Sequence, residues 1–420
     1  MRFVYSVFFY LLLPLILLRL LWRSIKNPDY RFRWFERLAI YQKSFPDTDI
    51  WFHAVSVGEA ESLFPLIRQI QARNPDLKLL VTTTTPTGSR RVQQTLKESV
   101  THVYLPYDLP DTVDRFFKKF KPRIAVIMET EIWPNLYAAC GKRKIPLYLI
   151  NARLSENSSR NYRKLSALVV PALEQIKLIA TQSDEDRLRY ISIGANLDKV
   201  VTMGNIKFDT PVDKRLLDAG QALRKKTFPD RWVWLLASTH EQEEALFFNI
   251  YQQLKNNIPE LLLVIAPRHP ERFKTVKKAC EQANLKVATR TLNELCNHET
   301  DVYLADTLGE LKTFYAATDI AFVGGSMVPS GGHNVLEASA IGTPVLFGPH
   351  MHHFKTIAKE ILEQEAAIQC SNMNEVADAV NILYQDNGYR IKLTTNGKNF
   401  ILKNQGVTSK ITELLVNEIK

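Results

Sequence analysis

From Ile50 onward, short continuous apolar runs alternate regularly with longer amphipathic stretches, and this alternation constrains the fold more than any other feature of the chain. A short run that is apolar at every position is typical of a strand buried on both faces. Such strands alternating with amphipathic helices form a parallel sheet covered by helices on both sides. The alternation therefore predicts an α/β fold, and 420 residues are enough for two domains of ordinary size.

The runs fall into two sets separated by a pause around Lys207–Asp213. In the first set we expect strands at Ile50–Val55, Leu77–Thr84, Arg123–Met128, Pro146–Asn151, Lys177–Thr181 and Val200–Met203, with helices at Glu59–Arg73, Arg90–Glu98 and Glu131–Lys142. In the second we expect strands at Trp232–Ala237, Leu261–Ala266, Lys286–Thr289, Val302–Ala305, Ile320–Val323 and Pro344–Phe347, with helices at Glu241–Leu254, Phe273–Asn284, Glu310–Ala317, Asn334–Ile341 and Phe354–Glu363. Tyr389–Ile419 is helical in character. Two doubly wound, Rossmann-like halves predict a ligand bound in a cleft at the carboxyl ends of the strands.

The first residues form an uncharged apolar segment, Phe3–Leu18, which extends to Trp22 if Arg19 is included. As a helix, Phe3–Trp22 is about 30 Å long, enough to span a bilayer core. Basic residues follow it and keep that flank cytoplasmic: Arg19, Arg23, Lys26, Arg31, Arg33 and Arg37. No small-residue cleavage site follows Leu18, which disfavours a signal peptide. Pro14 interrupts the run, so spanning the membrane and lying in its interface both stay open.

The formal net charge of +10 favours an anionic partner, which could be nucleic acid, a membrane surface or an acidic substrate. Much of this excess lies beside the apolar segment. A second basic cluster, 115–123, contains Phe116, Phe117 and Phe120. Exposed rings would suit stacking on nucleic-acid bases, but spacings of three and four residues place these rings on one helix face. We expect that face to be buried in a core, and we expect no nucleic-acid partner.

Acidic residues occur twice where a strand meets a helix. Glu59 ends the block His53–Glu59, and Glu129 and Glu131 lie in Met128–Asn135. Acids favour the first turn of a helix for electrostatic reasons alone, so a purely structural role is one interpretation. The other is catalytic, because two acids at strand ends of one sheet can face one cleft. One would then act as a general base, and the other would orient groups or raise the pKa of the first.

Glycine-rich stretches in the second half indicate a nucleotide. Gly324–Ser326 ends a strand, and the glycine pair of Gly331–Ala338 is expected to open a helix. Bare backbone at a helix N-terminus attracts phosphate, and Glu337 is one turn in, where it could accept hydrogen bonds from ribose hydroxyls. A plain glycine loop is the alternative. Arg268, in the loop 266–270, is a candidate for binding phosphate or a base edge, and Thr307–Glu310 follows another strand. No GxxxxGK[ST] sequence is present, which disfavours a P-loop ATPase.

Metal and redox motifs are weak. His350, His352 and His353 are close in sequence, but no HExxH and no nearby pair of acids completes a metal site, so we expect none. The four cysteines include no CxxC pair, which favours a reducing compartment over a disulfide framework or zinc knuckle.

Together these blocks resemble the Kdo (3-deoxy-D-manno-octulosonic acid) transferase family of the GT-B glycosyltransferases. The blocks that carry the resemblance are the anchor with its Arg31–Arg37 tail, His53–Glu59, Thr82–Gly88, Tyr104–Asp108, Met128–Asn135, Asn151–Ser155, Gly204–Asp209, Ser238–His240, Pro267–Pro270 and Gly331–Ala338. Each block is modest alone, but their number and order are specific, and they cover nearly the whole chain.

The resemblance implies a GT-B fold with four parts. These are an N-terminal membrane anchor over 1–22, a Rossmann-like acceptor domain over 23–206, a Rossmann-like CMP-sugar donor domain over 207–400, and a C-terminal helix over 401–420 that returns toward the first domain. It also implies an inner-membrane enzyme with its catalytic domains on the cytoplasmic face and an anionic membrane surface as a partner.

The implied reaction is transfer of Kdo from CMP-Kdo to a hydroxyl of the lipid A precursor, lipid IVA, in lipopolysaccharide core biosynthesis. It proceeds with inversion and needs neither metal nor cofactor. Glu59 resembles the general base, and Glu129 and Lys207 resemble groups that stabilise the transition state. The positions that resemble the CMP site are Pro267, Arg268, Leu308, Gly309, Glu310, Asn334, Val335, Leu336 and Glu337.

Two other functions are weighed against this one. The first is a GT-B enzyme that uses a different nucleotide sugar, which would bind UDP or GDP in place of CMP. The second is a membrane-tethered nucleic-acid binder, whose affinity would fall steeply with salt and require no nucleotide sugar. The ordered set of motifs disfavours the second.

Overall fold

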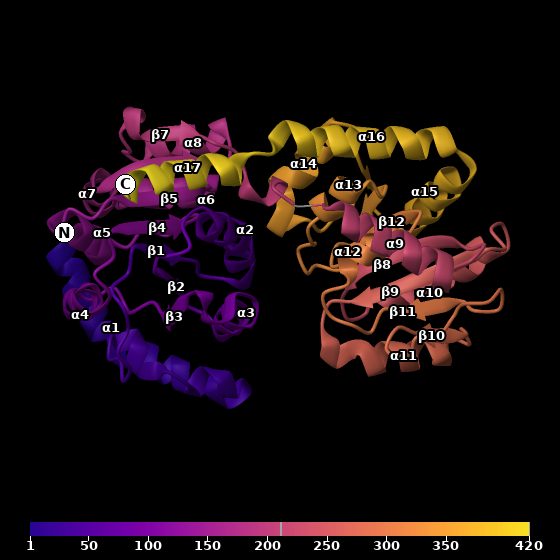
Figure 1. Ribbon diagram of the computed structural model, residues 1–420, viewed down its shortest axis with the longest axis horizontal. Coiled ribbons are helices and arrows are strands. Elements are labelled where there is room, and N and C mark those ends of the chain that lie inside the picture. Colours follow the sequence, from indigo (N-terminus) through magenta and orange to yellow (C-terminus); the bar gives the residue numbers. More distant parts are fainter. Residues whose placement is uncertain (211, 420) are drawn as a thin grey trace. The chain divides into compact units, whose positions relative to one another are not determined.

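The computed structural model describes residues 1–210 and 212–419. For Lys26 it describes the backbone but not the side chain. It contains two compact units (Figure 1). Unit 1 consists of Met1–Asp209 and the C-terminal segment from Gln405, and unit 2 consists of Thr210–Asn404. Each unit is built on a seven-stranded parallel sheet with helices on both faces, as the alternating sequence predicts.

The sheet of unit 1 has the strand order β3-β2-β1-β4-β5-β6-β7. The strands are β1 Ile50–His53, β2 Leu79–Thr83, β3 Thr101–Tyr104, β4 Ile124–Met128, β5 Leu147–Ala152, β6 Ile176–Thr181 and β7 Val200–Thr202. The order reverses between β1 and β4, which are neighbours in register from Ile50 opposite Ile124 to His53 opposite Ile127. In doubly wound folds, ligands bind beyond the carboxyl ends of the strands at such a reversal.

Helices cover both faces of this sheet. The α-helices of unit 1 are α1 Arg2–Lys26, α2 Val57–Arg73, α3 Pro86–Leu96, α4 Pro110–Phe120, α5 Pro134–Lys142, α6 Glu156–Lys164, α7 Ser166–Glu174, α8 Asp184–Ser192 and α17 Val407–Ile419. Short 3-10 turns lie at η1 Pro28–Arg31, η2 Trp34–Leu38, η3 Lys97–Ser99, η4 Leu197–Lys199 and η5 Ile206–Phe208. Side chains of β1 alternate between two cores, with Trp51 in one and Ile50 and Phe52 in the other.

The phenylalanines of α4 confirm the expectation of a buried helix face. Phe116, Phe117 and Phe120 are 0%, 2% and 0% exposed, and Trp51 packs against the first two. They belong to the core of unit 1 and offer no surface on which bases could stack.

Unit 2 repeats the plan with the strand order β10-β11-β9-β8-β12-β13-β14. Its strands are β8 Trp232–Thr239, β9 Leu261–Pro267, β10 Val287–Thr289, β11 Val302–Leu304, β12 Ile320–Val323, β13 Val345–Phe347 and β14 Ile368–Gln369. Its helices are α9 Lys214–Thr227, α10 Glu243–Lys255, α11 Phe273–Gln282, α12 Leu311–Ala316, α13 Leu336–Ile341, α14 Lys355–Glu363, α15 Met373–Gln385 and α16 Asn387–Asn404, with 3-10 turns at η6 Pro270–Arg272 and η7 His352–Phe354. Here the order reverses between β8 and β12.

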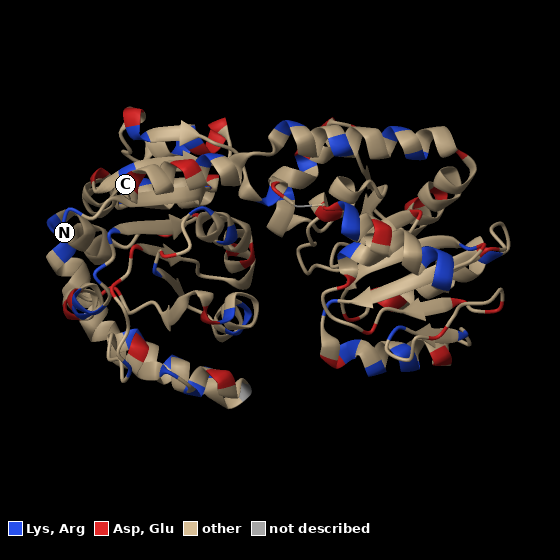
Figure 2. Ribbon diagram, in the orientation of Figure 1, with Lys and Arg blue, Asp and Glu red and all other residues tan. Residues whose placement is uncertain are grey.

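Every strand that the sequence predicts is present, and two strands were missed: β3 and the two-residue β14. Both lie at a sheet edge, where one side of the strand has no neighbour. Thr101 and His102 of β3 are only partly buried, so its sequence lacks the continuous apolar character of the others. Figure 2 shows the strands of both sheets almost wholly free of charged residues, which gather on helices and connections.

The last helix belongs to unit 1. The Asp209 carboxylate accepts hydrogen bonds from the N–H groups of Gly406, at 2.6 Å, and Thr408, at the start of α17. Val407 and Ile411 then join the core beside β1 and α2. The chain therefore leaves unit 1 after Asp209, and the returning segment is bound to unit 1 by the side chain of that same residue.

Candidate functional site

Three carboxylates gather at the carboxyl edge of unit 1, at the strand-order reversal. Glu59 lies in the first turn of α2, which follows β1. Glu129 and Glu131 follow β4, the neighbour of β1. The sheet topology thus brings together acids about seventy residues apart in sequence, since adjacent parallel strands end at the same edge.

Glu59 is held by a capping arrangement at the start of α2. Ser56 is the N-cap and accepts the Glu59 N–H, while its hydroxyl donates to Glu59 Oε1 at 2.9 Å. The N–H of Val55 donates to Glu59 Oε2 at 2.8 Å. This orients the carboxylate, and each oxygen keeps a lone pair for a further donor. Gly58 lies inside α2, with open space where a Cβ would stand.

Glu129 lies between two cations. Its Oε2 accepts from Arg153 Nε at 2.8 Å, and Lys207 Nζ lies 3.8 Å from its Oε1. The residue is 6% exposed and has a φ of 58°, in the left-handed region that non-glycine residues rarely occupy. Such backbone strain persists only where the surroundings enforce it, and it is concentrated at functional sites.

The acids affect each other's protonation. Burial raises the pKa of Glu59, and the negative charge of Glu129 raises it further. Burial, with the charges of Glu59 and Glu129, raises the pKa of Glu131 to about 7. Burial lowers the pKa of Lys207, while Glu129 opposes that change. A carboxylate with a raised pKa is a stronger base at neutral pH, as general base catalysis requires.

A chain of amide side chains positions the segment that carries Lys207. Asn205 accepts the Lys207 N–H at 3.0 Å and donates to Gln182 at 2.9 Å. Gln182 donates to the Asn151 carbonyl at 2.9 Å, and the Asn151 side chain accepts the N–H of Ile206 at 3.0 Å. Three sequence blocks are therefore locked together behind the Glu129–Lys207 pair.

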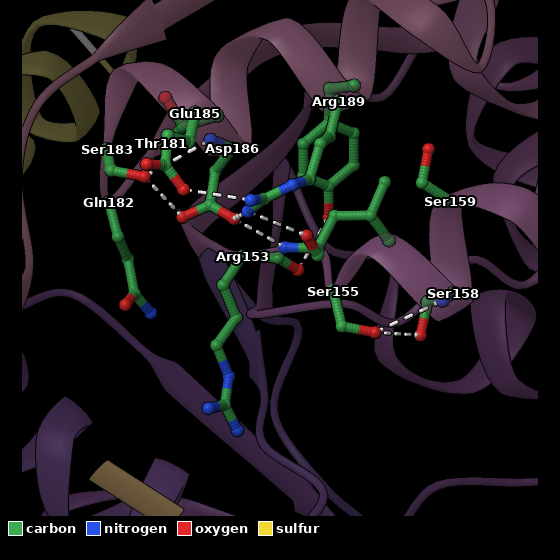
Figure 3. Close-up of polar contacts among 12 residues, drawn as sticks. Arg153, Ser155, Ser158, Ser159, Thr181, Gln182, Ser183, Glu185, Asp186 and Arg189 are labelled. Atoms are coloured by element: carbon green, nitrogen blue, oxygen red, sulfur yellow. Dashed lines mark hydrogen bonds and ion pairs between the residues drawn. The ribbon is translucent and has the colours of Figure 1, made fainter. Parts of the chain in front are cut away.

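Arg153 is oriented by the loop from which it projects, shown in Figure 3. The Asp186 carboxylate accepts the Leu154 N–H at 2.8 Å and the Ser183 hydroxyl at 2.8 Å, and Arg189 bonds Asp186 in turn. In the figure the Arg153 side chain points away from this network. Its guanidinium pairs with Glu129 and remains half exposed, so it can meet a further anion.

The carboxyl edge of unit 2 collects cations and imidazoles instead. His240 follows β8, Arg268 follows β9, and His333 lies after β12. The Nε2 atoms of His240 and His333 are 2.8 Å apart, and the ring of His269 lies edge-on to His240. Burial and the positive charge of Arg268 lower the pKa of His333 to about 3. Arg268 is exposed and available to an anionic ligand.

The two glycine loops have contacts that differ from those of the phosphate site predicted from sequence. The N–H groups of Gly325, Ser326 and Met327 all donate to the carboxylate of Glu243, at 2.7, 3.2 and 3.0 Å. Glu243 is fully buried, so the chain's own carboxylate already occupies the amides of the first glycine loop.

The second glycine pair opens no helix, because α13 begins only at Leu336. Gly331 and Gly332 have φ values of 99° and 73°, which a right-handed helix excludes. A Cβ on Gly332 would lie 2.2 Å from Met351 Sδ. These glycines permit a turn and close packing rather than exposing a helix end.

The other residues predicted to bind the nucleotide differ in burial and in their contacts. The side chains of Val335 and Leu336 are fully buried, so only their backbone can meet a ligand. Asn334 accepts the Leu336 N–H at 3.1 Å, and Arg290 binds Glu310 through two hydrogen bonds of 3.0 and 2.7 Å. Pro267 ends β9 in a buried position, whereas Leu308 and Gly309 are exposed and Glu337 is partly buried. Arg268 and Glu337 are therefore the strongest side-chain candidates.

Within the residues that the structure describes, no group of three histidine, cysteine or acidic side chains is arranged to hold a metal ion. The rings of His352 and His353 lie edge to face, 4.5 Å apart, beside the Gly331 turn.

The basic residues after the apolar segment do not form a single membrane-facing belt. Arg37 is 7% exposed, donates to the Thr84 carbonyl at 2.8 Å and lies over the ring of Tyr104. Arg33 bonds Glu36 and the His102 carbonyl. Both stabilise the fold of unit 1. Arg19, Arg23 and Arg31 are exposed, and the side chain of Lys26 lies outside the described part of the chain.

Several residues at these two edges are not among the site residues predicted from sequence. Arg153 and Asn205 lie in blocks that carry the family resemblance, and that was the only signal available for them. His240 and His333 also lie in such blocks, whereas Glu243 had no local signature. The contacts of Glu243 and His240 form only in the folded chain, because their partners lie more than eighty residues away in sequence.

Comparison with known proteins adds the family. A family model described as 3-deoxy-D-manno-octulosonic-acid transferase (kdotransferase) matches residues 32–210, and one described as group 1 glycosyl transferases matches residues 239–400. The chain is 38% identical over 417 residues to the 3-deoxy-D-manno-octulosonic acid transferase of Haemophilus influenzae, covering 99% of this chain and 98% of that protein. It is 34% identical to the same-named protein of Bordetella pertussis, covering 87% and 86% of the two.

Solved structures show the fold. UDP-GlcNAc 2-epimerase from Neisseria meningitidis matches with a TM-score of 0.58 at 16% identity, covering 88% of this chain and 100% of that chain. A glycosyltransferase from Rickettsia africae matches with a TM-score of 0.56 at 12% identity, covering 90% and 100%. Two Rossmann-like domains of this kind constitute the GT-B fold.

Proposed function

The chain belongs to the family of 3-deoxy-D-manno-octulosonic acid (Kdo) transferases, and on that premise we propose that it transfers Kdo from CMP-Kdo to a hydroxyl of lipid IVA, with inversion and without a metal ion. Membership makes it a Kdo-transferring glycosyltransferase of lipopolysaccharide biosynthesis, with a nucleotide-sugar donor and a glycolipid acceptor. The donor, the acceptor and the residue roles are the proposal.

The orientation and environment of Glu59 are the observation that carries the proposal. An inverting transfer needs one base that removes the proton of the acceptor hydroxyl while the leaving group departs from the opposite face. Glu59 is held by Val55 and Ser56, has a raised pKa, and has open space beside it at Gly58. The acceptor hydroxyl would donate to its carboxylate and lose its proton to it as the new glycosidic bond forms.

Charge stabilisation is assigned to the Glu129–Lys207 pair. Cleavage of the bond to CMP leaves negative charge on the phosphate, and the Kdo carboxylate carries another negative charge. Lys207 supplies a cation for one of them, and Glu129 holds that cation in place and keeps it protonated. Arg153, half exposed and bound to the same carboxylate, supplies a second cation.

Donor binding is assigned to unit 2, chiefly to Arg268 and Glu337. Because Glu243 already occupies the amides of the glycine loop, the single phosphate of CMP would be bound by a side chain such as Arg268. Glu337 would accept hydrogen bonds from ribose hydroxyls. Leu308 and Gly309, which are exposed, would contact the nucleotide base.

Membrane association follows from the glycolipid acceptor and from α1. Among the described residues one helix is long and apolar enough to cross a membrane, Arg2–Ile25, with 11% of its most apolar window buried. We assign the enzyme to the inner membrane, with both units on the cytoplasmic face where a CMP-sugar is available.

The test is an assay of CMP-Kdo with lipid IVA, with products identified by mass spectrometry. Glu59→Gln should lower turnover by about 10²–10⁴-fold while CMP still binds, because general base catalysis contributes on that scale. Glu61→Gln is the matched control, since Glu61 pairs with Arg91 on the surface of the same helix. Near-normal turnover in Glu59→Gln would remove the base assignment. Activity only with a UDP- or GDP-sugar would refute the donor.

A further inference from the structure

Helix α1 packs along unit 1 with one face and leaves the opposite face uncovered. The packed residues recur every three or four positions: Tyr5, Ser6, Phe9, Leu12, Leu13, Ile16, Leu17, Leu20 and Ser24 are buried or partly buried. The uncovered residues recur with the same spacing and are at least 43% exposed: Val4, Val7, Phe8, Leu11, Leu15, Leu18, Trp22 and Ile25. Because a helix turns once in about 3.6 residues, these sets occupy opposite faces.

The N-terminal part of the helix is fastened by polar contacts. The Tyr5 hydroxyl hydrogen-bonds to the Asp108 carboxylate, and Ser6 Oγ accepts from Asn135 Nδ2 at 3.0 Å. The Tyr10 hydroxyl donates to Asp111 at the start of α4. Asp108 is 2% exposed and also accepts the N–H groups that begin α5. The contact is therefore built into the body of unit 1.

The C-terminal part of α1 packs against the same unit. Leu20 and Ser24 are 8% and 1% exposed, and α1 packs against η1. Arg23 lies 5.7 Å from the centre of the Tyr30 ring in η1. Figure 1 shows α1 running along the outside of unit 1, beside α4 and α5.

Contact at both ends is incompatible with spanning. If the helix crossed a bilayer, its two ends would lie on opposite sides, about 30 Å apart. The part of unit 1 that touches Tyr5 and Tyr10 would then lie within or beyond the hydrocarbon. That part carries the Asp111–Arg115 and Asp114–Lys118 ion pairs on α4, and charged groups are costly there.

We propose that α1 lies in the plane of an anionic bilayer surface, with its exposed apolar face in the acyl boundary and unit 1 fastened along its other face. Arg19 and Arg23 are exposed near the C-terminal end of α1, where they would meet lipid phosphates. Phe32 and Phe35, which are 66% and 60% exposed, extend the apolar surface beyond the helix. The arrangement keeps the carboxylates of unit 1 at a constant height above the lipid. It rests on the membrane association proposed above and is independent of the donor and acceptor.

Depth measurement tests this arrangement in the full-length protein. All four native cysteines are buried, so single cysteines at Val4, Leu11 and Leu18 can carry nitroxide labels. The protein is bound to vesicles of phosphatidylethanolamine and phosphatidylglycerol, and label depth is read from oxygen and nickel-chelate collisions. Ile16→Cys, on the packed face, is the matched control.

An in-plane helix places all three labels at one depth, about 5–10 Å below the headgroups, while the Ile16 label meets neither collider freely. In a spanning helix the Leu11 label would be about 10 Å deeper than the other two, since seven residues rise by that amount. That gradient would overturn the proposal and leave membrane association intact. Failure of the protein to sediment with the vesicles would overturn both.

Discussion

Unit 1 and unit 2 share a seven-stranded parallel sheet whose strand order reverses at its centre, yet different side chains gather at the two reversals. In unit 1, three carboxylates with one arginine and one lysine follow β1 and β4 and their neighbours. In unit 2, an arginine and three histidines follow β8, β9 and β12, and the buried carboxylate of Glu243 accepts hydrogen bonds from backbone amides.

On the proposed function, the difference lets one architecture serve two tasks. Removal of a proton from an acceptor hydroxyl requires carboxylates of raised pKa, which unit 1 obtains by burying them close together. Holding a nucleotide phosphate requires positive charge, which Arg268 of unit 2 would supply. The sheet supplies the edge in both cases, and the residues after each strand determine the chemistry.

The largest change in turnover that would test this comparison is expected from a substitution of Lys207. Lys207→Met should lower turnover by about 10²–10³-fold, the scale of removing one preorganised charge from a transition state. CMP affinity should stay near normal, because donor binding is assigned to unit 2. Steady-state kinetics and calorimetric titration with CMP measure the two. Lys78→Met, at an exposed lysine before β2, is the control. Unchanged turnover in Lys207→Met would show that the pair has only a structural role.

The reciprocal change is in unit 2. Arg268→Ala should weaken CMP binding by about 1–3 kcal/mol, roughly 5–150-fold, because the phosphate loses its charged donor. Glu337→Ala should weaken it on the same scale if its carboxylate meets the ribose. Lys274→Ala, an exposed lysine in neighbouring α11, is the control. Normal CMP affinity in both variants would place the nucleotide elsewhere and break the division of labour between the units.

A smaller effect should appear in the pH dependence of stability. The pKa of Glu131 is raised from 4.5 to about 7 by burial, Glu59 and Glu129. The folded state then binds more protons than the unfolded state between those values, so this group's contribution to stability falls as pH rises through them. Glu131→Gln should therefore raise the Tm relative to the natural chain at pH 8 and not at pH 4. Glu61→Gln is the control, and an equal rise there would contradict an origin in the acidic cluster.

The smallest expected effect is that of a chelator, which should leave turnover unchanged. CMP carries one phosphate, and we assign the binding of its charge to Arg268 rather than to a metal ion. Activity is measured with and without excess EDTA. A loss that a divalent ion restores would mean that a metal supplements the cations of one unit.

The sequence by itself determined the architecture, because the periodicity of apolar residues is local. Continuous runs such as Leu261–Ala266 predict buried strands wherever they occur, and the spacing of the phenylalanines in α4 predicts a buried face without knowledge of any partner. Strand β3 was missed because part of it is only partly buried, so its sequence is not continuously apolar. The candidate site residues came from the family resemblance, and spacing alone left Glu59 and Glu129 open between cap and catalyst.

Only the tertiary structure decided which of these residues meet. Glu129 pairs with Arg153 and Lys207 because β4 lies between β1 and β5 and because η5 folds back to the same edge. Glu243 takes the amides of a loop more than eighty residues later, which no local pattern could show. Arg33 and Arg37 belong in sequence to the basic flank of the apolar segment, yet they turn inward to the carbonyls of His102 and Thr84. Hydrogen bonds and ion pairs act over a few ångströms in space, so their partners are set by the order of strands in the sheet and not by distance along the chain.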